Sequence, residues 1–293
     1  MSGVGISPRE GSSRSNANVP DFIRIFGILG LVALLGVIFG SVLADMAHDW
    51  WTDPAWSQGM LLPPLAFYVA WLRRDYILTL PEVPEGRGML LTAFGCSVFI
   101  LGKLASEFFL ARISFVIVLA GLIWTFWGRR RLHALGFPLL LLATMVPLPV
   151  MFYNSVAAPL QLFASETATR MVQALGVTVF RDGNIIQLAS ISLGVAEACS
   201  GLHSLSALVV GSIVLGFVWC NGVAARILLV AISIPLAIGV NVVRVAGTAI
   251  LADHNEEFAL GFYHAFSGWL IFVAGFGILY LMAKVLHRVM DRE

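Results

Sequence analysis

In Val195-Ala196-Glu197-Ala198-Cys199-Ser200-Gly201-Leu202-His203-Ser204, a carboxylate, a thiol, two hydroxyls and an imidazole lie within one short segment. The sequence on both sides of this segment is far more apolar. Polar and ionisable groups beside a membrane span are costly to place and usually serve a function. We therefore expect the functional site in this segment and expect the apolar sequence around it to form the scaffold.

The composition of the chain indicates a membrane protein. Of its 293 residues, 59% are hydrophobic and 12% are charged, and the mean hydropathy is +0.89. Soluble domains are roughly half apolar and about a quarter charged. The net charge of +1 excludes little, whereas the three cysteines, being odd in number, cannot all pair within the chain.

Eight apolar segments reach or approach the length of about 20 residues that a membrane-spanning helix requires. They are residues 22–44, 58–72, 88–106, 109–127, 134–150, 202–219, 226–251 and 264–284. The sequence thus predicts an all-α integral membrane protein with about eight transmembrane helices.

The interval 151–198 is more polar than the predicted spans. Residues 156–175 have the pattern of an amphipathic helix that lies in the membrane interface. Residues 177–188 predict a β-hairpin with Asp182-Gly183 in its turn. We expect this interval to form a re-entrant or surface cap and not a span.

The distribution of basic residues predicts the orientation. With the N-terminus in the cytoplasm, all but five of the 18 lysines and arginines lie on the cytoplasmic side, as the positive-inside rule requires. The five exceptions are Lys103, Arg112, Arg170, Arg181 and Arg244. Both termini are then cytoplasmic, and the cap and Cys199 face the extracytoplasmic side of the plasma (inner) membrane. The predicted organisation is a disordered tail (1–21), a membrane domain (22–284, with the cap at about 151–198 and the active-site spans at about 199–284) and a second tail (285–293).

Several kinds of functional site have no signature in the sequence. There is no CxxC or HExxH spacing, so we expect no metal site. There is no glycine-rich phosphate loop and no basic nucleic-acid patch. We therefore expect no cofactor and no nucleic-acid partner.

Cys199 is the candidate nucleophile. It lies where the cap meets the sixth predicted span, and a helix N-terminus favours the reactive thiolate. Ser200 is small and leaves the sulfur accessible. The commoner role of a membrane cysteine is that of a small buried hydrophobe, which is our interpretation of Cys96 and Cys220.

Residues on two other spans are predicted to reach the same membrane face. Arg244 lies inside the seventh span, where an arginine costs at least ~2.5–3.5 kcal/mol and needs a partner. Asn241, three residues earlier, shares its helical face. His264 opens the last span and could act as general base, although His203, four residues after Cys199, competes for that role. Snorkelling of Arg244 to the interface is the non-functional alternative.

These motifs, in this order along the chain, resemble those of the exosortase/archaeosortase family, membrane cysteine enzymes that process proteins with a C-terminal sorting signal. The residues that carry the resemblance are Glu197-Ala198-Cys199-Ser200-Gly201 with Ser204, Asn241-Val242-Val243-Arg244, and His264 with Gly268. Supporting stretches are Trp56 to Pro63, Pro147-Leu148-Pro149 and Asp182-Gly183-Asn184, so that the resemblance spans about 56–270.

The resemblance implies a catalytic trio of Cys199, Arg244 and His264. Supporting roles fall on Asn241, Glu197, Ser200 and His203. Two positions depart from the family pattern: Gln58 stands where histidine is frequent, and His203 stands where arginine is common. Gln58 is therefore not expected to be an indispensable base.

The implied function is that of a cysteine peptidase or transpeptidase of the PEP-CTERM type. Its partners would be membrane lipid and the sorting signal of secreted proteins (a short motif, a hydrophobic helix and a basic tail). The secreted substrate protein would be cleaved at the extracytoplasmic face and transferred to an amine or another acceptor. Two non-enzymatic alternatives stay open: a transporter or lipid-binding protein with Arg244 on an anionic head group, and a factor in exopolysaccharide export.

Overall fold

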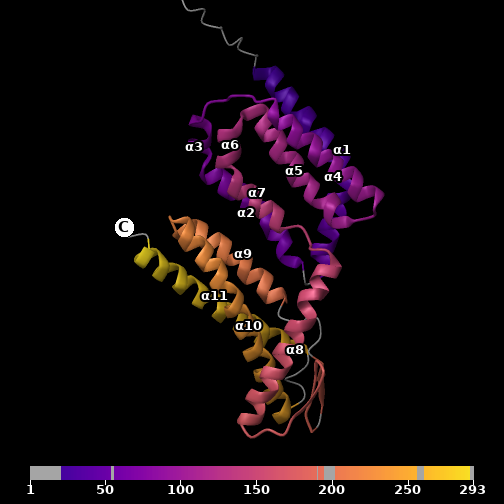
Figure 1. The fold of residues 1–293 in the computed structure, drawn as a ribbon, viewed down its shortest axis with the longest axis vertical. Helices are drawn as coiled ribbons and strands as arrows, with labels where there is room; N and C mark the ends of the chain where they lie inside the picture. Colours follow the sequence, from indigo (N-terminus) through magenta and orange to yellow (C-terminus); the bar gives the residue numbers. More distant parts are fainter. Residues whose placement is uncertain (1–20, 54–55, 190, 195–201, 256–260, 291–293) are drawn as a thin grey trace, which may run out of the picture. The chain divides into compact units, whose positions relative to one another are not determined.

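The computed structural model describes residues 21–53, 56–189, 191–194, 202–255 and 261–290, which are mostly helical (Figure 1). The chain divides into two compact units, residues 1–43 and 44–293. The first unit contains most of helix α1 (Asp21–Thr52). The second contains η1 (Ser57–Leu61), α2 (Leu62–Leu72), α3 (Arg74–Thr79), α4 (Arg87–Leu104), α5 (Phe108–Trp127), α6 (Arg129–Ala134), α7 (Gly136–Thr144), α8 (Val150–Ala174), β1 (Phe180–Asp182), β2 (Ile185–Gln187), β3 (Ser192–Gly194), α9 (Leu202–Trp219), α10 (Val223–His254) and α11 (Gly261–Met290).

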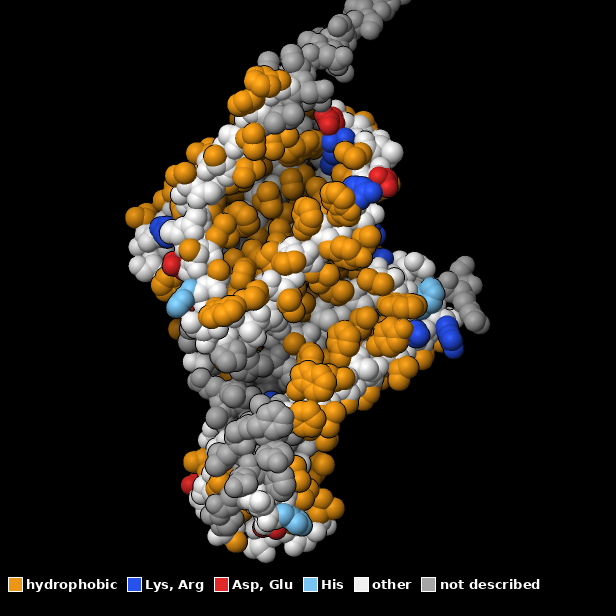
Figure 2. Space-filling view, turned by 180° about the vertical axis from the view of Figure 1, so that it is seen from behind, with side chains coloured by type: hydrophobic (Ala, Val, Ile, Leu, Met, Phe, Trp, Pro, Cys, Tyr) orange, Lys and Arg blue, Asp and Glu red, His pale blue; other side chains and the backbone are white. Residues whose placement is uncertain are grey.

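Five helices in the described part of the chain are long and apolar enough to cross a membrane. They are Phe26–Thr52 of α1, all of α4, α5 and α10, and Gly268–Met290 of α11. The apolar part of α9, Ser204–Trp219, is shorter. Large hydrophobic side chains cover much of the molecular face in Figure 2, as expected where helices face lipid. The prediction of a multi-pass, mainly α-helical membrane protein is confirmed, and the number of eight spans stays a prediction.

Two predicted spans are shorter in the structure than in the sequence analysis. The segment 58–72 forms η1 followed by the 11-residue α2, and the segment 134–150 forms mainly the 9-residue α7. These two helices pack against each other. At about 1.5 Å per residue, neither alone covers a hydrocarbon core about 30 Å thick. The helical path is interrupted at Arg73 and Leu135, where new short helices meet α2 and α7.

Helices α4 and α5 pack backbone to backbone. Gly88, Gly95 and Gly102 recur at intervals of seven residues along α4, and all three are buried. A Cβ atom added at any of them would press on backbone atoms of α5; at Gly102 the nearest is the Ala111 nitrogen, at 2.5 Å. Small residues permit such close approach of transmembrane helices, so α4 and α5 form a tight antiparallel pair.

The loop between α3 and α4 is fastened to α5 and α6. Trp124 Nε1 donates a hydrogen bond to Glu85 Oε2 at 3.0 Å, and this bond lowers the pKa of Glu85 below its ordinary value. Arg131 is buried and lies 2.8 Å from Glu82 Oε1, and its guanidinium also donates to the Leu80 carbonyl at 2.9 Å. These contacts hold the polar loop in one place.

The predicted β-hairpin is present, but its turn lies one residue later than predicted. The register pairs Asp182 with Ile185, so Gly183 and Asn184 form the turn. Gly183 has φ +61°, which suits the first central position of a type II′ turn and which glycine adopts without strain. Strand β3 pairs with β2 to complete an antiparallel sheet of order β1-β2-β3.

The small sheet and α8 share one hydrophobic core with α10. Ile186 of β2 is fully buried in it, and Leu193 of β3 packs against its edge. The other buried members are Ala168 and Val172 of α8, Val179 and Leu188 beside the hairpin, and Val245, Ala246 and Ala249 of α10. This core joins the cap elements to the helix that carries Arg244.

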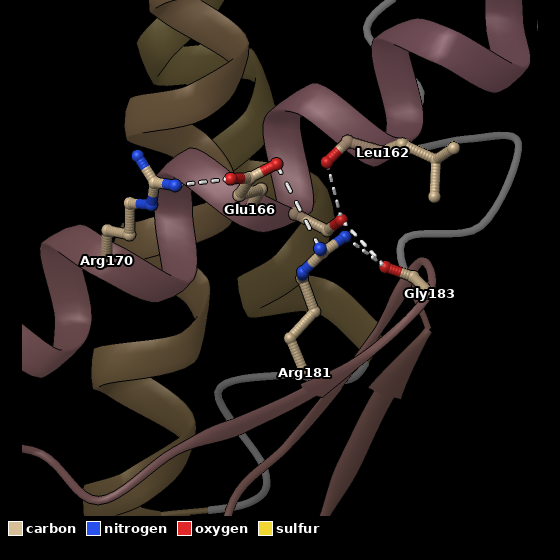
Figure 3. A network of polar contacts seen from close by, with 6 residues as sticks. Leu162, Glu166, Arg170, Arg181 and Gly183 are labelled. Carbon is tan, nitrogen blue, oxygen red and sulfur yellow. Dashed lines mark hydrogen bonds and ion pairs between the residues drawn. The ribbon is translucent and has the colours of Figure 1, made fainter.

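Polar contacts also fasten the hairpin to α8 (Figure 3). The buried Ser165 hydroxyl donates to the Gly183 carbonyl at 3.1 Å, and Arg181 Nη1 donates to the same carbonyl at 2.9 Å. Glu166 lies 2.5 Å from Arg170 Nη2 and 3.9 Å from Arg181 Nη2. The turn is thus tied to the middle of α8 by neutral and charged contacts together.

Helices α9, α10 and α11 lie side by side and form a second core (Figure 1). Its fully buried members include Leu208 of α9, Leu229 of α10 and Leu279 of α11. The sequence analysis assigned the site to residues 195–204. Residues 202–204 belong to α9 of this three-helix group, and residues 195–201 lie outside the described residues.

Candidate active site

Arg244 lies on the C-terminal half of α10, and its side chain is half-buried. Its Nε atom and the Oδ1 atom of Asn241 are both buried, and Asn241 is 3% exposed. The Thr248 hydroxyl donates to the Arg244 carbonyl at 2.9 Å, one turn further along the helix. Asn241 is thus buried and Arg244 half-buried, three residues apart on α10.

The guanidinium of Arg244 lies directly against the backbone of α11 at Gly268. A Cβ atom built on Gly268 would lie 2.9 Å from Nη2, 3.0 Å from Cζ and 3.1 Å from Nε of Arg244. These are the nearest atoms to that position, so the guanidinium fills the space that a larger residue would occupy. The structure therefore joins two of the motifs that are far apart in sequence.

His264 occupies a helical position of α11 that precedes Gly268 by four residues. Residues four apart share one face of an α-helix and lie about 6 Å apart along its axis. Position 264 is accordingly on the face of α11 that turns toward α10 at Gly268, one turn nearer the N-terminal end of α11. The His264 side chain itself is outside the part of the structure that is described.

The start of α9 lies at the level of Arg244. A Cβ atom on Gly275 would lie 3.0 Å from a Val240 methyl and 3.7 Å from Leu208 Cδ1, so these residues mark one level of the group. Further along both helices, the Trp219 ring of α9 lies 5.7 Å from the Tyr280 ring of α11. Because this second contact follows the first in both helices, α9 and α11 run in the same direction. On α11, Gly268 lies about two turns before Gly275. On α9, the first residue, Leu202, lies six residues before Leu208. At 1.5 Å per residue both separations are about 9–10 Å, so Leu202 and Gly268 lie at a similar level.

Three residues of the predicted site lie outside the described residues: Cys199, Glu197 and Ser200. His203 has a described position in the first turn of α9, but its side chain is outside the description. Among the described residues, β3 ends at Gly194 and α9 begins at Leu202, and both elements pack against α10.

The supporting stretches at Trp56 to Pro63 and at Pro147 to Pro149 are linked by residues that the sequence analysis did not select. Trp50 Nε1 donates to the Met145 carbonyl at 3.2 Å, and the Trp50 indole also covers Gly59. The Trp56 and Tyr153 rings are 5.5 Å apart. The sequence shows Trp50 shortly before the first stretch, but it does not show that Trp50 contacts Met145.

A partly buried ion pair accompanies this region. Arg112 Nη2 lies 2.5 Å from Asp49 Oδ2, with the arginine side chain 9% exposed and the aspartate side chain 36% exposed. The sequence analysis counted Arg112 only as one of five basic residues on the extracytoplasmic side. In the described part of the chain, no group of three His, Cys, Asp or Glu side chains is close enough to hold a metal ion.

Comparison with known proteins identifies the family. The family described as Transmembrane exosortase (Exosortase_EpsH) matches residues 50–281, which is more than half of the chain and includes the cap and α9–α10. Searches of curated proteins and of solved structures each gave no significant match. Membership implies the processing of proteins through C-terminal sorting signals in general. The chain belongs to the transmembrane exosortase family.

Proposed function

We propose that this protein is a membrane cysteine peptidase or transpeptidase that cleaves the C-terminal sorting signal of secreted proteins at the extracytoplasmic face of the plasma membrane. Cys199 is the nucleophile, His264 the general base and Arg244 the electrostatic stabiliser. The single observation that best supports this proposal is the contact of the Arg244 guanidinium with α11 one helical turn from position 264. This contact puts Arg244 beside the helix that carries position 264, which supports the proposed roles of the two residues.

The chain geometry supports a position for Cys199 near this pair. Only two residues separate Cys199 from Leu202, the start of α9, and three residues of chain reach at most about 10 Å. Leu202 in turn begins α9 at about the level of Gly268 and Arg244. The described start of α9 is therefore compatible with the proposal that Cys199 acts together with Arg244 and His264.

In the proposed reaction, the Cys199 sulfur attacks the scissile carbonyl carbon and its proton passes to the His264 imidazole. The Arg244 guanidinium stabilises the negative charge that develops on the carbonyl oxygen. When the carbon–nitrogen bond breaks, His264 returns the proton to the leaving amine, and a thioester remains on Cys199. An acceptor amine, another acceptor or water then attacks the thioester and restores the thiol.

Asn241, Glu197, Ser200 and His203 are proposed to support the site. Asn241 is buried beside Arg244 on α10 and is placed to orient the arginine side chain. His203 is the competing candidate for the base, because it occupies the first turn of α9 beside the proposed nucleophile. Removal of each histidine separately decides between them: the base is the one whose loss abolishes processing.

The test uses a secreted reporter with a Pro-Glu-Pro-type tail, co-expressed with the chain and analysed by gel mobility and by mass spectrometry of its new C-terminus. The wild type is expected to shorten the reporter, and Cys199→Ala is expected to abolish this effect while the protein still inserts. Cys96→Ala and Cys220→Ala are matched controls that remove an exposed and a buried cysteine and should process normally. Undiminished processing by Cys199→Ala would refute the proposal, and no shortening of the reporter by a normally inserted wild type would favour a non-enzymatic role.

A further inference from the structure

Three glycines of α11 differ in what surrounds them. A Cβ atom added at Gly277 would meet nothing within 4 Å, and one added at Gly275 would meet the side chains of Val240 and Leu208. At Gly268, by contrast, the nearest atoms all belong to the guanidinium of Arg244, at 2.9–3.1 Å. Ordinary contact between such heavy atoms is at about 3.5–4.0 Å. A side chain at position 268 is therefore incompatible with the present place of that guanidinium.

The clash would displace the arginine head group and leave the helices in place. The guanidinium is the far end of a long flexible side chain, whereas the backbone of α11 is held by the core around Leu279 and Ala283. The softer part moves first, so the cost to folding is small. To restore ordinary contact the guanidinium must move by roughly 0.5 Å, and misplacements on the order of 1 Å can lower a rate by about 100-fold.

We propose that Gly268 is a positioning residue: its bare backbone is the platform on which the Arg244 guanidinium rests, one helical turn from His264. This inference rests on the proposed function, because it assigns Gly268 a role through Arg244. It explains why a glycine is needed at this position for a reason other than helix packing. Small residues are common between membrane helices for packing alone, and Gly275, which faces apolar side chains, represents that ordinary role.

The test compares Gly268→Ala with Gly277→Ala, which makes the same substitution in the same helix without a clash. Both variants gain the higher helix propensity of alanine over glycine, so neither should lose thermal stability in detergent. Gly268→Ala is expected to lower the maximal rate of reporter processing about 10- to 100-fold with little change in the substrate concentration at half-maximal rate. Gly277→Ala should match the wild type.

The dependence on Arg244 is tested by a double-mutant cycle. Lysine has a narrower head group than arginine, so Gly268→Ala should cause no further loss of rate in an Arg244→Lys background. A wild-type rate for Gly268→Ala, or an equal loss in both backgrounds, would overturn the inference. If no wild-type processing is detected, the proposed function fails separately. In that case the rate at which phenylglyoxal modifies Arg244, measured by mass spectrometry, tests the role of Gly268. A rate that changes in Gly268→Ala but not in Gly277→Ala supports the positioning role, and equal rates in the two variants refute it.

Discussion

Replacement of Ile186 by alanine should loosen the cap, and its neighbour Ile185 supplies a matched control. The two residues are adjacent in β2, but Ile186 is fully buried in the core shared with α10, whereas Ile185 is 40% exposed. Truncation of the Ile186 side chain beyond Cβ removes buried carbons worth about 0.8 kcal/mol each, or roughly 2.4 kcal/mol in total. The cavity left behind raises the expected loss into the range of about 2–5 kcal/mol.

Hydrogen exchange of the hairpin amides, followed by mass spectrometry, measures this loss directly. A decrease of about 2.4 kcal/mol in the free energy of local opening corresponds to exchange about 50-fold faster. Ile185→Ala should change the exchange rate only a few-fold, because the exposed Ile185 side chain loses little packing when it is truncated. Equal acceleration in the two variants, or unchanged exchange in Ile186→Ala, would refute the packing of the hairpin on α10.

Two further perturbations test contacts away from the proposed site. Arg112→Ala leaves the Asp49 carboxylate without its partner and should lower the free energy of unfolding by about 1–3 kcal/mol. The control, Lys103→Ala at an exposed position, should change it by less than about 0.5 kcal/mol. Thermal unfolding in detergent compares the two variants, and equal effects would contradict the ion pair. The lowered pKa of Glu85 stabilises the fold above the ordinary glutamate pKa, and this contribution is lost as the pH falls through the folded-state pKa. Acid unfolding curves should therefore show a weaker pH dependence in Glu85→Gln than in the wild type, and identical curves would count against the Trp124 contact.

The sequence predicted local features well where a short pattern determines them. The hairpin at 177–188 has a turn signal between apolar runs, and the structure contains it. The position of the turn was wrong by one residue, because the register depends on which isoleucine enters the core with α10. The burial of Ile186 and the pairing of Asp182 with Ile185 place Gly183 first in the turn.

Predictions that depend on helix length and on contacts between helices were less accurate. Apolar composition alone does not reveal that the first residues of 58–72 form the 3-10 helix η1, or that α7 begins at Gly136 and ends at Thr144 within 134–150. The coincidence of Cys199, Arg244 and His264 at one membrane face was predicted from topology and stays a prediction. The contact of Gly268 with the guanidinium could not be predicted, because it depends on the rotation of α10 against α11.

The seven-residue glycine repeat of α4 bears on the order in which the protein is built. Helices α4 and α5 are separated by residues 105–107 only, so they can pair as soon as both have left the ribosome and entered the bilayer. Proposed catalytic positions 199, 244 and 264 are all synthesised later. The growing chain therefore carries a finished helical pair long before it carries a complete trio, and a truncated translation product would be stably embedded yet inert toward the secreted proteins around it.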